Sequence, residues 1–157
     1  MKILIDTNVL IDYIANRDPF AKAAEDIIVL CKDQKIEGCI AAHSLMNIFY
    51  ILRKSMSVSE RKAFLFYLSQ ITEIIGIDRQ KILNCIQNES FSDFEDCLQS
   101  ECAKSFYADW IVTRNVKDFA DSEIKAISPD EFLKIINPNV GCFYQNGMSA
   151  TLDGFCF

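Results

Sequence analysis

The stretch Lys2-Ile3-Leu4-Ile5-Asp6-Thr7-Asn8-Val9-Leu10 decides the fold of this chain. Residues 2–5 form a short run of aliphatic and β-branched type, which is typical of a buried strand. Asp6 ends the run, and apolar residues then recur at helical spacing as far as Ile14. A strand that passes directly into a helix at an acidic residue predicts an α/β sheet with a carboxylate at its carboxyl edge.

Strand-like and helix-like segments alternate along the rest of the chain, which predicts a parallel sheet with helices on both faces. Further strands are expected at residues 38–41, 72–77, 108–112 and 126–127. Helices are expected at residues 6–16, 44–54, 78–87, 93–106 and 129–136, and two more begin at Asp18 and at Ser57 or Ser59. Ser92 is the expected cap of helix 93–106.

Two further acidic segments lie where apolar runs end, one with Asp93 and Asp96 and the other with Asp118. Asp93 and Asp96 are three residues apart and therefore share one helical face, whereas Glu95 is expected to point to solvent. Carboxylates that meet at one sheet edge repel one another unless a cation joins them. The pattern therefore indicates a divalent-metal site in a protein that acts on phosphate esters.

Each of these acids also has an ordinary structural interpretation. Asp6 and Asp93 are suitable helix caps, and Asp118 is a suitable solvated acid on a loop. Asp96 fits a cap less well, because core residues surround it in the sequence. Singly, these interpretations are adequate, and only the acids taken together favour a metal site.

Three segments of the chain occur in a recognisable order. They are Ile3-Leu4-Ile5-Asp6-Thr7-Asn8-Val9-Leu10, Asp93-Phe94-Glu95-Asp96 and Ile111-Val112-Thr113-Arg114-Asn115-Val116-Lys117-Asp118-Phe119. In this order they resemble a PIN domain, the fold of the bacterial VapC-type toxin ribonucleases. The resemblance implies a PIN-like three-layer α/β/α sandwich with a central, mainly parallel sheet. It covers residues 1–136, expected to be a PIN-like domain, and leaves residues 137–157 as a C-terminal extension.

The resemblance also implies a set of functional residues. A Mg²⁺ or Mn²⁺ ion would be held by Asp6, Asp96 and Asp118, with Asp93 as a further catalytic residue. The ion would activate a water for in-line attack on an RNA phosphodiester. Thr7, Thr113 and Asn115 would orient water or a carboxylate, and Arg114 and Lys117 would contact RNA phosphate.

The chain departs from the family pattern at one acidic position. PIN domains usually carry a glutamate on the helix after the second strand, where this chain has Asn47. No Asp or Glu occurs from Gly38 to Ser59, so no neighbour can replace it by a shift in register. Asn47 offers a carbonyl oxygen without negative charge. The resemblance therefore implies a nuclease that is weakened, that binds a single metal, or that is inactive.

Two functions from different classes stay open. The first is a cytoplasmic PIN-type endoribonuclease, the toxin of a toxin–antitoxin pair, with a cognate antitoxin and, by resemblance, a homodimeric state. The second is a degenerate PIN-like module that binds RNA or a protein partner without cleaving. A haloacid-dehalogenase-type phosphohydrolase is disfavoured, because it needs a second Asp where Asn8 stands.

Composition limits the partners and the compartment. The formal net charge of -6 argues against strong non-specific binding of polyanions. No apolar segment has the character of a membrane span or a signal peptide. The seven cysteines contain no CxxC pair, so free thiols in a reducing cytoplasm are expected. His43, the single histidine, is expected near the acidic pocket rather than in a Ser-His-Asp triad.

Overall fold

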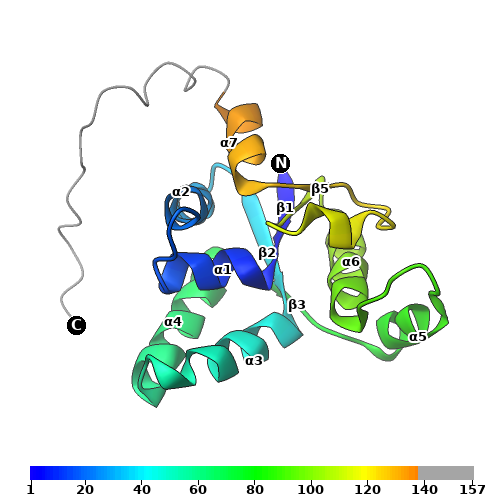
Figure 1. Cartoon of the computed structure of the whole chain (residues 1–157), viewed down its shortest axis with the longest axis horizontal. Helices are drawn as coiled ribbons and strands as arrows, with labels where there is room; N and C mark the ends of the chain where they lie inside the picture. The colour runs from blue at the N-terminus through cyan, green and yellow to red at the C-terminus, as the bar shows by residue number, and fades with distance from the viewer. Residues whose placement is uncertain (138–157) are drawn as a thin grey trace.

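The computed structural model describes residues 1–137, which contain one five-stranded parallel sheet (Figure 1). Its strands are β1 (Lys2–Ile5), β2 (Glu37–Ala41), β3 (Glu73–Ile75), β4 (Trp110–Val112) and β5 (Ala126–Ile127). They lie in the order β3-β2-β1-β4-β5, and every neighbouring pair runs parallel. The expected parallel α/β fold is confirmed.

Seven α-helices connect and flank the strands within residues 1–137. They are α1 (Thr7–Ile14), α2 (Ala21–Lys32), α3 (Ala42–Ile51), α4 (Val58–Ile71), α5 (Arg79–Gln87), α6 (Phe94–Phe106) and α7 (Pro129–Ile136), with 3-10 turns η1 (Leu52–Lys54) and η2 (Val116–Phe119). Three helix starts were wrongly expected, and one of them is α3, which begins at Ala42 rather than at Ser44. Residues 18–20 form a turn, so α2 begins at Ala21, and the cap of α6 is Asp93 rather than Ser92.

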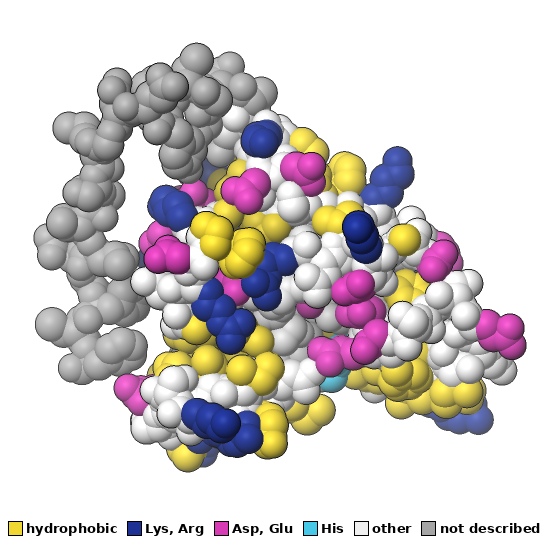
Figure 2. Space-filling model, in the orientation of Figure 1, with side chains coloured by type: hydrophobic (Ala, Val, Ile, Leu, Met, Phe, Trp, Pro, Cys, Tyr) yellow, Lys and Arg dark blue, Asp and Glu magenta, His cyan; other side chains and the backbone are white. Residues whose placement is uncertain are grey.

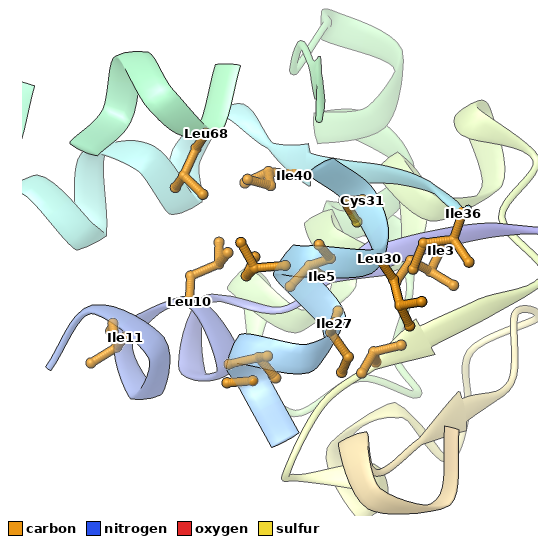
Figure 3. Close-up of a cluster of buried hydrophobic side chains, with 14 of the residues drawn as sticks. Ile3, Ile5, Leu10, Ile11, Ile27, Leu30, Cys31, Ile36, Ile40 and Leu68 are labelled. Atoms are coloured by element: carbon orange, nitrogen blue, oxygen red, sulfur yellow. The ribbon is translucent and has the colours of Figure 1, made fainter. Parts of the chain in front are cut away.

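The two faces of the sheet bury two separate apolar clusters, so the expected three-layer sandwich is confirmed. On one face, Ile3 and Ile5 pack with side chains of α1, α2, α3, α4 and α7, and Figure 3 shows part of this larger cluster. On the other face, Leu4 packs with side chains of α6. In Figure 1 the strands accordingly separate α6 from α1 and α2. Successive residues of β1 thus enter opposite layers, as in a strand buried on both faces.

The larger cluster leaves no space for a side chain at Gly38 in β2. A Cβ there would lie 2.7 Å from Cys31 Sγ and 3.2 Å from Ile5 Cδ1. We expect Gly38→Ala to lower the free energy of unfolding by about 1–3 kcal/mol, the usual cost of overpacking a core. Gly76→Ala is the matched control, because a Cβ at Gly76 would have no neighbour within 4 Å. Urea unfolding measures both variants, and equal stability of the two would contradict this packing.

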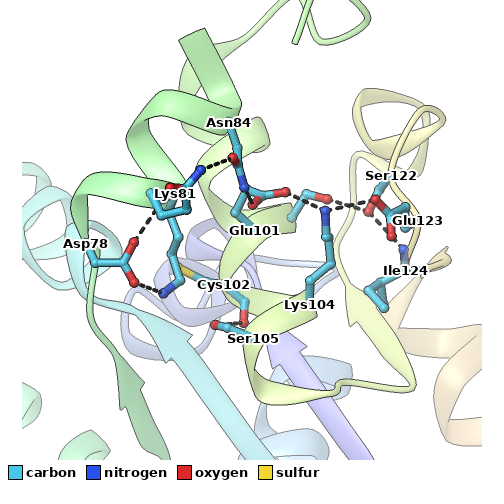
Figure 4. Close-up of polar contacts among 12 residues, drawn as sticks. Asp78, Lys81, Asn84, Glu101, Cys102, Lys104, Ser105, Ser122, Glu123 and Ile124 are labelled. Atoms are coloured by element: carbon cyan, nitrogen blue, oxygen red, sulfur yellow. Dashed lines mark hydrogen bonds and ion pairs between the residues drawn. The ribbon is translucent and has the colours of Figure 1, made fainter. Parts of the chain in front are cut away.

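A polar network holds α6 to its neighbours on the second face of the sheet (Figure 4). Asn84 of α5 donates to Glu101 of α6 over 2.6 Å. Lys104 of α6 pairs with Glu101 at 2.7 Å and with Glu123, which follows η2, at 2.8 Å. The network fixes α6 relative to the segment that follows β4. These two elements carry two of the candidate acids.

The C-terminal helix of the described chain belongs to the same core as the sheet. Phe132 of α7 is fully buried in the larger cluster. The domain boundary at residue 136 stays a prediction, and the expected extension 137–157 lies, apart from Asn137, outside the described residues. Among the helices of residues 1–137, none combines the length and the apolar character needed to cross a bilayer.

Candidate metal centre at the carboxyl edge of the sheet

The central strands β1 and β4 lie where the strand order of the sheet reverses. The strands β2 and β3 lie beyond β1 on one side, and β5 lies beyond β4 on the other. In parallel α/β sheets the crevice at the carboxyl ends of such strands is the usual ligand site. Asp6 and Thr113 are the first residues beyond these strands, and Asp6 N donates to Val112 O at 3.0 Å. Both candidate residues therefore lie at the carboxyl edge of the sheet, where such a crevice is expected.

Asp6 is buried and firmly oriented, with only 5% of its surface exposed. Thr113 Oγ1 donates to its Oδ2 at 2.6 Å, and Asn8 Nδ2 donates to the same oxygen. Gln99 Nε2 donates to the other oxygen, Oδ1, at 2.9 Å. Burial raises the pKa of Asp6, while the hydrogen bonds from Thr113 and Gln99 oppose that rise. The carboxylate is held in one direction at the edge of the sheet.

Thr113 joins the ends of β1 and β4 through its side chain. Besides its bond to Asp6, its Oγ1 accepts from Asn8 Nδ2 at 3.1 Å and from Asn115 N at 3.0 Å. Asn8 Oδ1 in turn accepts from Arg114 N at 3.3 Å. Thr113, which the sequence analysis named as a site residue, therefore contacts Asp6 directly. Asn115 contributes its backbone N–H to this arrangement, and its side chain is exposed.

Asp93 and Asp96 begin α6. Asp93 is exposed, and its Oδ1 accepts from Glu95 N at 2.7 Å and from Asp96 N at 3.3 Å. The capping interpretation of Asp93 therefore describes what its carboxylate does here. Asp96 is half-buried, and burial, together with the charges of Asp93, Asp6, Asp118 and Glu95, raises its pKa to about 7.

Asp118 lies on η2 and is exposed. Its backbone N–H donates to Asn115 O at 3.0 Å, which closes the short turn after β4. Although Asp6, Asp96 and Asp118 come from three separate elements, their charges interact, because both of the others contribute to the raised pKa of Asp96. Figure 2 shows acidic side chains grouped on one face of the molecule, with the histidine beside them.

The Glu95 carboxylate lies beside the starts of α1 and α3, so the expectation that it points to solvent was wrong. Thr7 Oγ1 donates a long hydrogen bond of 3.5 Å to Glu95 Oε1, and His43 Nε2 lies 3.9 Å from the same oxygen. The physical reason is that the first turn of α6 lies beside the starts of α1 and α3. Side chains that point in different directions from this turn, such as Glu95 and Asp96, therefore both lie near the candidate site. The expected residue Thr7 therefore contacts a carboxylate, that of Glu95.

The helix α3 supplies His43 and Asn47, which are four residues apart and therefore share one face. Asn47 is half-buried. His43 is buried, and burial lowers its pKa, while the charge of Asp6 opposes this effect. Neither ring nitrogen of His43 has a hydrogen-bond partner among residues 1–137. His43 thus lies near the acidic pocket, as expected.

Gln99 is a site residue that the sequence analysis missed. It is 1% exposed and donates to Asp6, while its own Oε1 has no hydrogen-bond partner in the described chain. Gln99 follows Asp96 by three residues on α6, so the two share a helical face. That spacing is the signal that would have identified Gln99 from the sequence.

A second missed feature is the ion pair between Asp12 and Arg114. Asp12 is 1% exposed, and its Oδ2 lies 2.9 Å from Arg114 Nε. The N–H is not directed at the oxygen, so the contact is electrostatic rather than a hydrogen bond. The guanidinium of Arg114 also lies over the ring of Phe20, 4.6 Å from its centroid. Of the two expected phosphate contacts, Arg114 is thus paired within the fold, whereas Lys117 is exposed.

The side chains at this edge of the sheet include suitable oxygen ligands for a divalent cation, but these ligands are not already grouped around one point. Within residues 1–137, no three His, Cys, Asp or Glu side chains are grouped closely enough to hold an ion together. The donors are carboxylate oxygens, which hard cations prefer, and Mg²⁺ commonly keeps several waters and uses one or two carboxylates. A cation would also relieve the repulsion that contributes to the raised pKa of Asp96. The donor set therefore suits a hard divalent cation that is bound partly through water.

The pKa of Asp96 makes the stability of the metal-free protein depend on pH. Because this pKa is about 7 in the folded state and about 4 in the unfolded state, the folded protein holds the extra proton between these values. Stability is therefore greater at the acidic end of this window and decreases as the pH rises through it. We expect the thermal midpoint in EDTA to fall from about pH 5 to about pH 8, and Asp96→Asn to reduce that fall. A pH dependence that the substitution leaves unchanged would contradict this assignment.

Comparison with known proteins agrees with the fold. A family model described as PIN domain matches residues 2–117. A toxin–antitoxin complex from Klebsiella pneumoniae is similar with a TM-score of 0.61 and 22% sequence identity, over 81% of this chain and 97% of that chain. A VapBC2 structure from Rickettsia felis, bound to a DNA fragment from their promoter, has a TM-score of 0.58 and 20% identity, over 82% of this chain and 98% of that chain. No curated protein matches the chain.

Proposed function

Because the chain belongs to the PIN domain family, we propose that it is a metal-dependent endoribonuclease of the PIN type. One observation carries this proposal. Carboxylates from three separate elements, those of Asp6, Asp96 and Asp118, lie near one another at the carboxyl edge of the sheet, since burial first, and then the charges of Asp93, Asp6 and Asp118, raise the pKa of Asp96 to about 7. A cation bound there would relieve this repulsion, which supports a role in phosphodiester chemistry.

The proposed roles follow from the position of each side chain. Asp6, Asp96 and Asp118 would hold Mg²⁺ or Mn²⁺, which lowers the pKa of a bound water and neutralises charge on the phosphate. Thr113 and Gln99 hold the Asp6 carboxylate in a fixed direction through their hydrogen bonds. Asp93 caps α6 and keeps Asp96 at the start of that helix. Lys117 is the exposed cation on the same segment as Asp118 and is the better placed of the two expected contacts with RNA phosphate.

A protein partner is the second part of the proposal. Of the two similar structures named above, one is described as a toxin–antitoxin complex and the other as VapBC2 bound to promoter DNA, which supports a toxin role with a cognate antitoxin. The chain also exposes large apolar side chains on two adjoining helices, namely Met46 and Tyr50 of α3 and Phe66 of α4. Exposed apolar groups of this kind are typical of surfaces that a partner covers. The homodimer, the cytoplasmic location and the domain boundary at residue 136 belong to the same proposal.

A degenerate module that binds RNA or protein without cleaving is the alternative. Asn47 favours it, because this residue brings no charge to the position where the family usually has a glutamate. The scattered arrangement of the acids favours it too, since no three potential ligands are grouped within the described chain.

A cleavage assay on a mixed RNA pool separates the two functions. We expect the wild-type protein to cut RNA in Mn²⁺ and to stop in EDTA, and Asn47→Glu to cut faster by about tenfold or more, because it adds charge at the centre. A wild-type protein that binds the RNA but leaves it intact, while Asn47→Glu cuts, would identify the degenerate module. If neither form cuts or binds metal, the nuclease proposal fails.

A further inference from the structure

The side of the candidate centre formed by α3 lacks negative charge. Asn47 is neutral, and no acidic residue occurs between Gly38 and Ser59. The polar residue that α3 does bring towards the acids is His43, one turn before Asn47 on the same face. If a cation bound here, the charge on this side would have to come from another element.

Glu95 of α6 reaches this side of the crevice. Its Oε1 lies 3.5 Å from Thr7 Oγ1, at the start of α1, and 3.9 Å from Nε2 of His43 on α3. One carboxylate therefore lies between the starts of three helices. An acid that served only the helix dipole of α6 would not need contacts with two other elements. Its charge also acts on its neighbour Asp96, so it is part of the same electrostatic cluster.

The burial of His43 gives independent evidence that a ligand, an ion or a water belongs beside its imidazole ring. It is 9% exposed, and both ring nitrogens lack a hydrogen-bond partner within residues 1–137. A buried polar group without a partner costs about 1–3 kcal/mol, so such groups are normally satisfied by a ligand, an ion or a water. The separation of 3.9 Å between His43 Nε2 and Glu95 Oε1 is too long for a hydrogen bond.

We propose that Glu95 is a metal-binding carboxylate of this chain, which supplies the negative charge that position 47 lacks. This inference rests on the proposed metal centre. In this proposal the carboxylate comes from Glu95 in the first turn of α6 instead of from position 47 in α3. Gln99 and Thr113 orient Asp6 by direct hydrogen bonds.

Calorimetric titration of the metal-free full chain with Mn²⁺ tests the proposal. We expect Glu95→Gln to weaken Mn²⁺ binding by about tenfold or more, within the range for groups that orient or supply metal ligands. Glu89→Gln is the matched control, because Glu89 is an exposed glutamate on the loop that precedes α6, and it should bind Mn²⁺ like the wild type. The Glu95 side chain is 39% exposed, so its replacement should leave thermal stability near that of the wild type.

A rescue variant distinguishes a role of Glu95 in metal binding from a role in local structure alone. Asn47→Glu combined with Glu95→Gln returns the acid to α3, and we expect it to recover most of the Mn²⁺ affinity that Glu95→Gln loses. Wild-type affinity in Glu95→Gln, or no recovery in the double variant, would overturn the proposal and leave the metal centre itself standing. A wild-type protein that binds no Mn²⁺ would overturn the metal centre and this inference together.

Discussion

Asp6→Asn is expected to reduce RNA cleavage in Mn²⁺ by at least about a hundredfold, while the protein stays folded. Asp6 is the most deeply buried of the acids at the crevice, and the side chains of Thr113 and Gln99 fix its direction. Asparagine preserves the shape of the side chain but removes the charge that would hold a cation. Because burial already raises the pKa of Asp6, removing this charge need not lower stability.

The rate of cleavage of an end-labelled RNA, measured with enzyme in excess, gives the effect of Asp6→Asn directly. Asp130→Asn is the control, because Asp130 is an exposed acid in the first turn of α7 and should leave the rate unchanged. Circular dichroism of both variants reports whether they fold. Cleavage by folded Asp6→Asn at the wild-type rate would place the reaction somewhere other than this crevice.

Arg114→Ala is expected to lower the free energy of unfolding by about 3 kcal/mol, the cost of leaving a buried charge without its partner. Asp12 is 1% exposed, and Arg114 Nε is its near partner at 2.9 Å. The other cation, Arg17, lies 4.0 Å from the second oxygen and has a side chain that is 47% exposed, so solvent screens it. The substitution also removes the contact between the guanidinium and the ring of Phe20.

Chemical unfolding measures this loss, with Lys117→Ala as the matched control on the same segment. Lys117 is exposed, so its replacement should change stability by no more than about 0.5 kcal/mol. Asp12→Asn combined with Arg114→Ala should recover part of the loss, because the buried charge is then absent. If Arg114 served RNA phosphate instead, Arg114→Ala would weaken RNA binding and leave stability unchanged.

Most of the fold was predictable because its signals are local. The apolar run from Ile3 to Ile5, and similar short runs elsewhere, identified the strands, and the helices between them required a parallel sheet. The errors lie at helix starts, where several residues compete for the same amide groups. Asp93, rather than Ser92, caps α6 because its carboxylate accepts from two amides of the first turn.

The candidate site was predictable only in part. The position of Asp6, at the end of a central strand, follows from its sequence context alone. The direction of Glu95 does not, because it depends on how α6 meets α1 and α3 in three dimensions. The pair of Asp12 and Arg114 is equally non-local, since 102 positions separate two residues that share no pattern.

The most direct test of the metal centre is a Mn²⁺ titration of the metal-free wild type and of Asp6→Asn, followed by calorimetry at a pH above 7. The wild type should bind Mn²⁺ with a measurable heat, because Asp96 is then largely ionised and adds its charge to that of Asp6 and Asp118. Asp6→Asn should lose that heat. Equal binding by the two proteins, or none by the wild type, would contradict a cation site at the ends of β1 and β4.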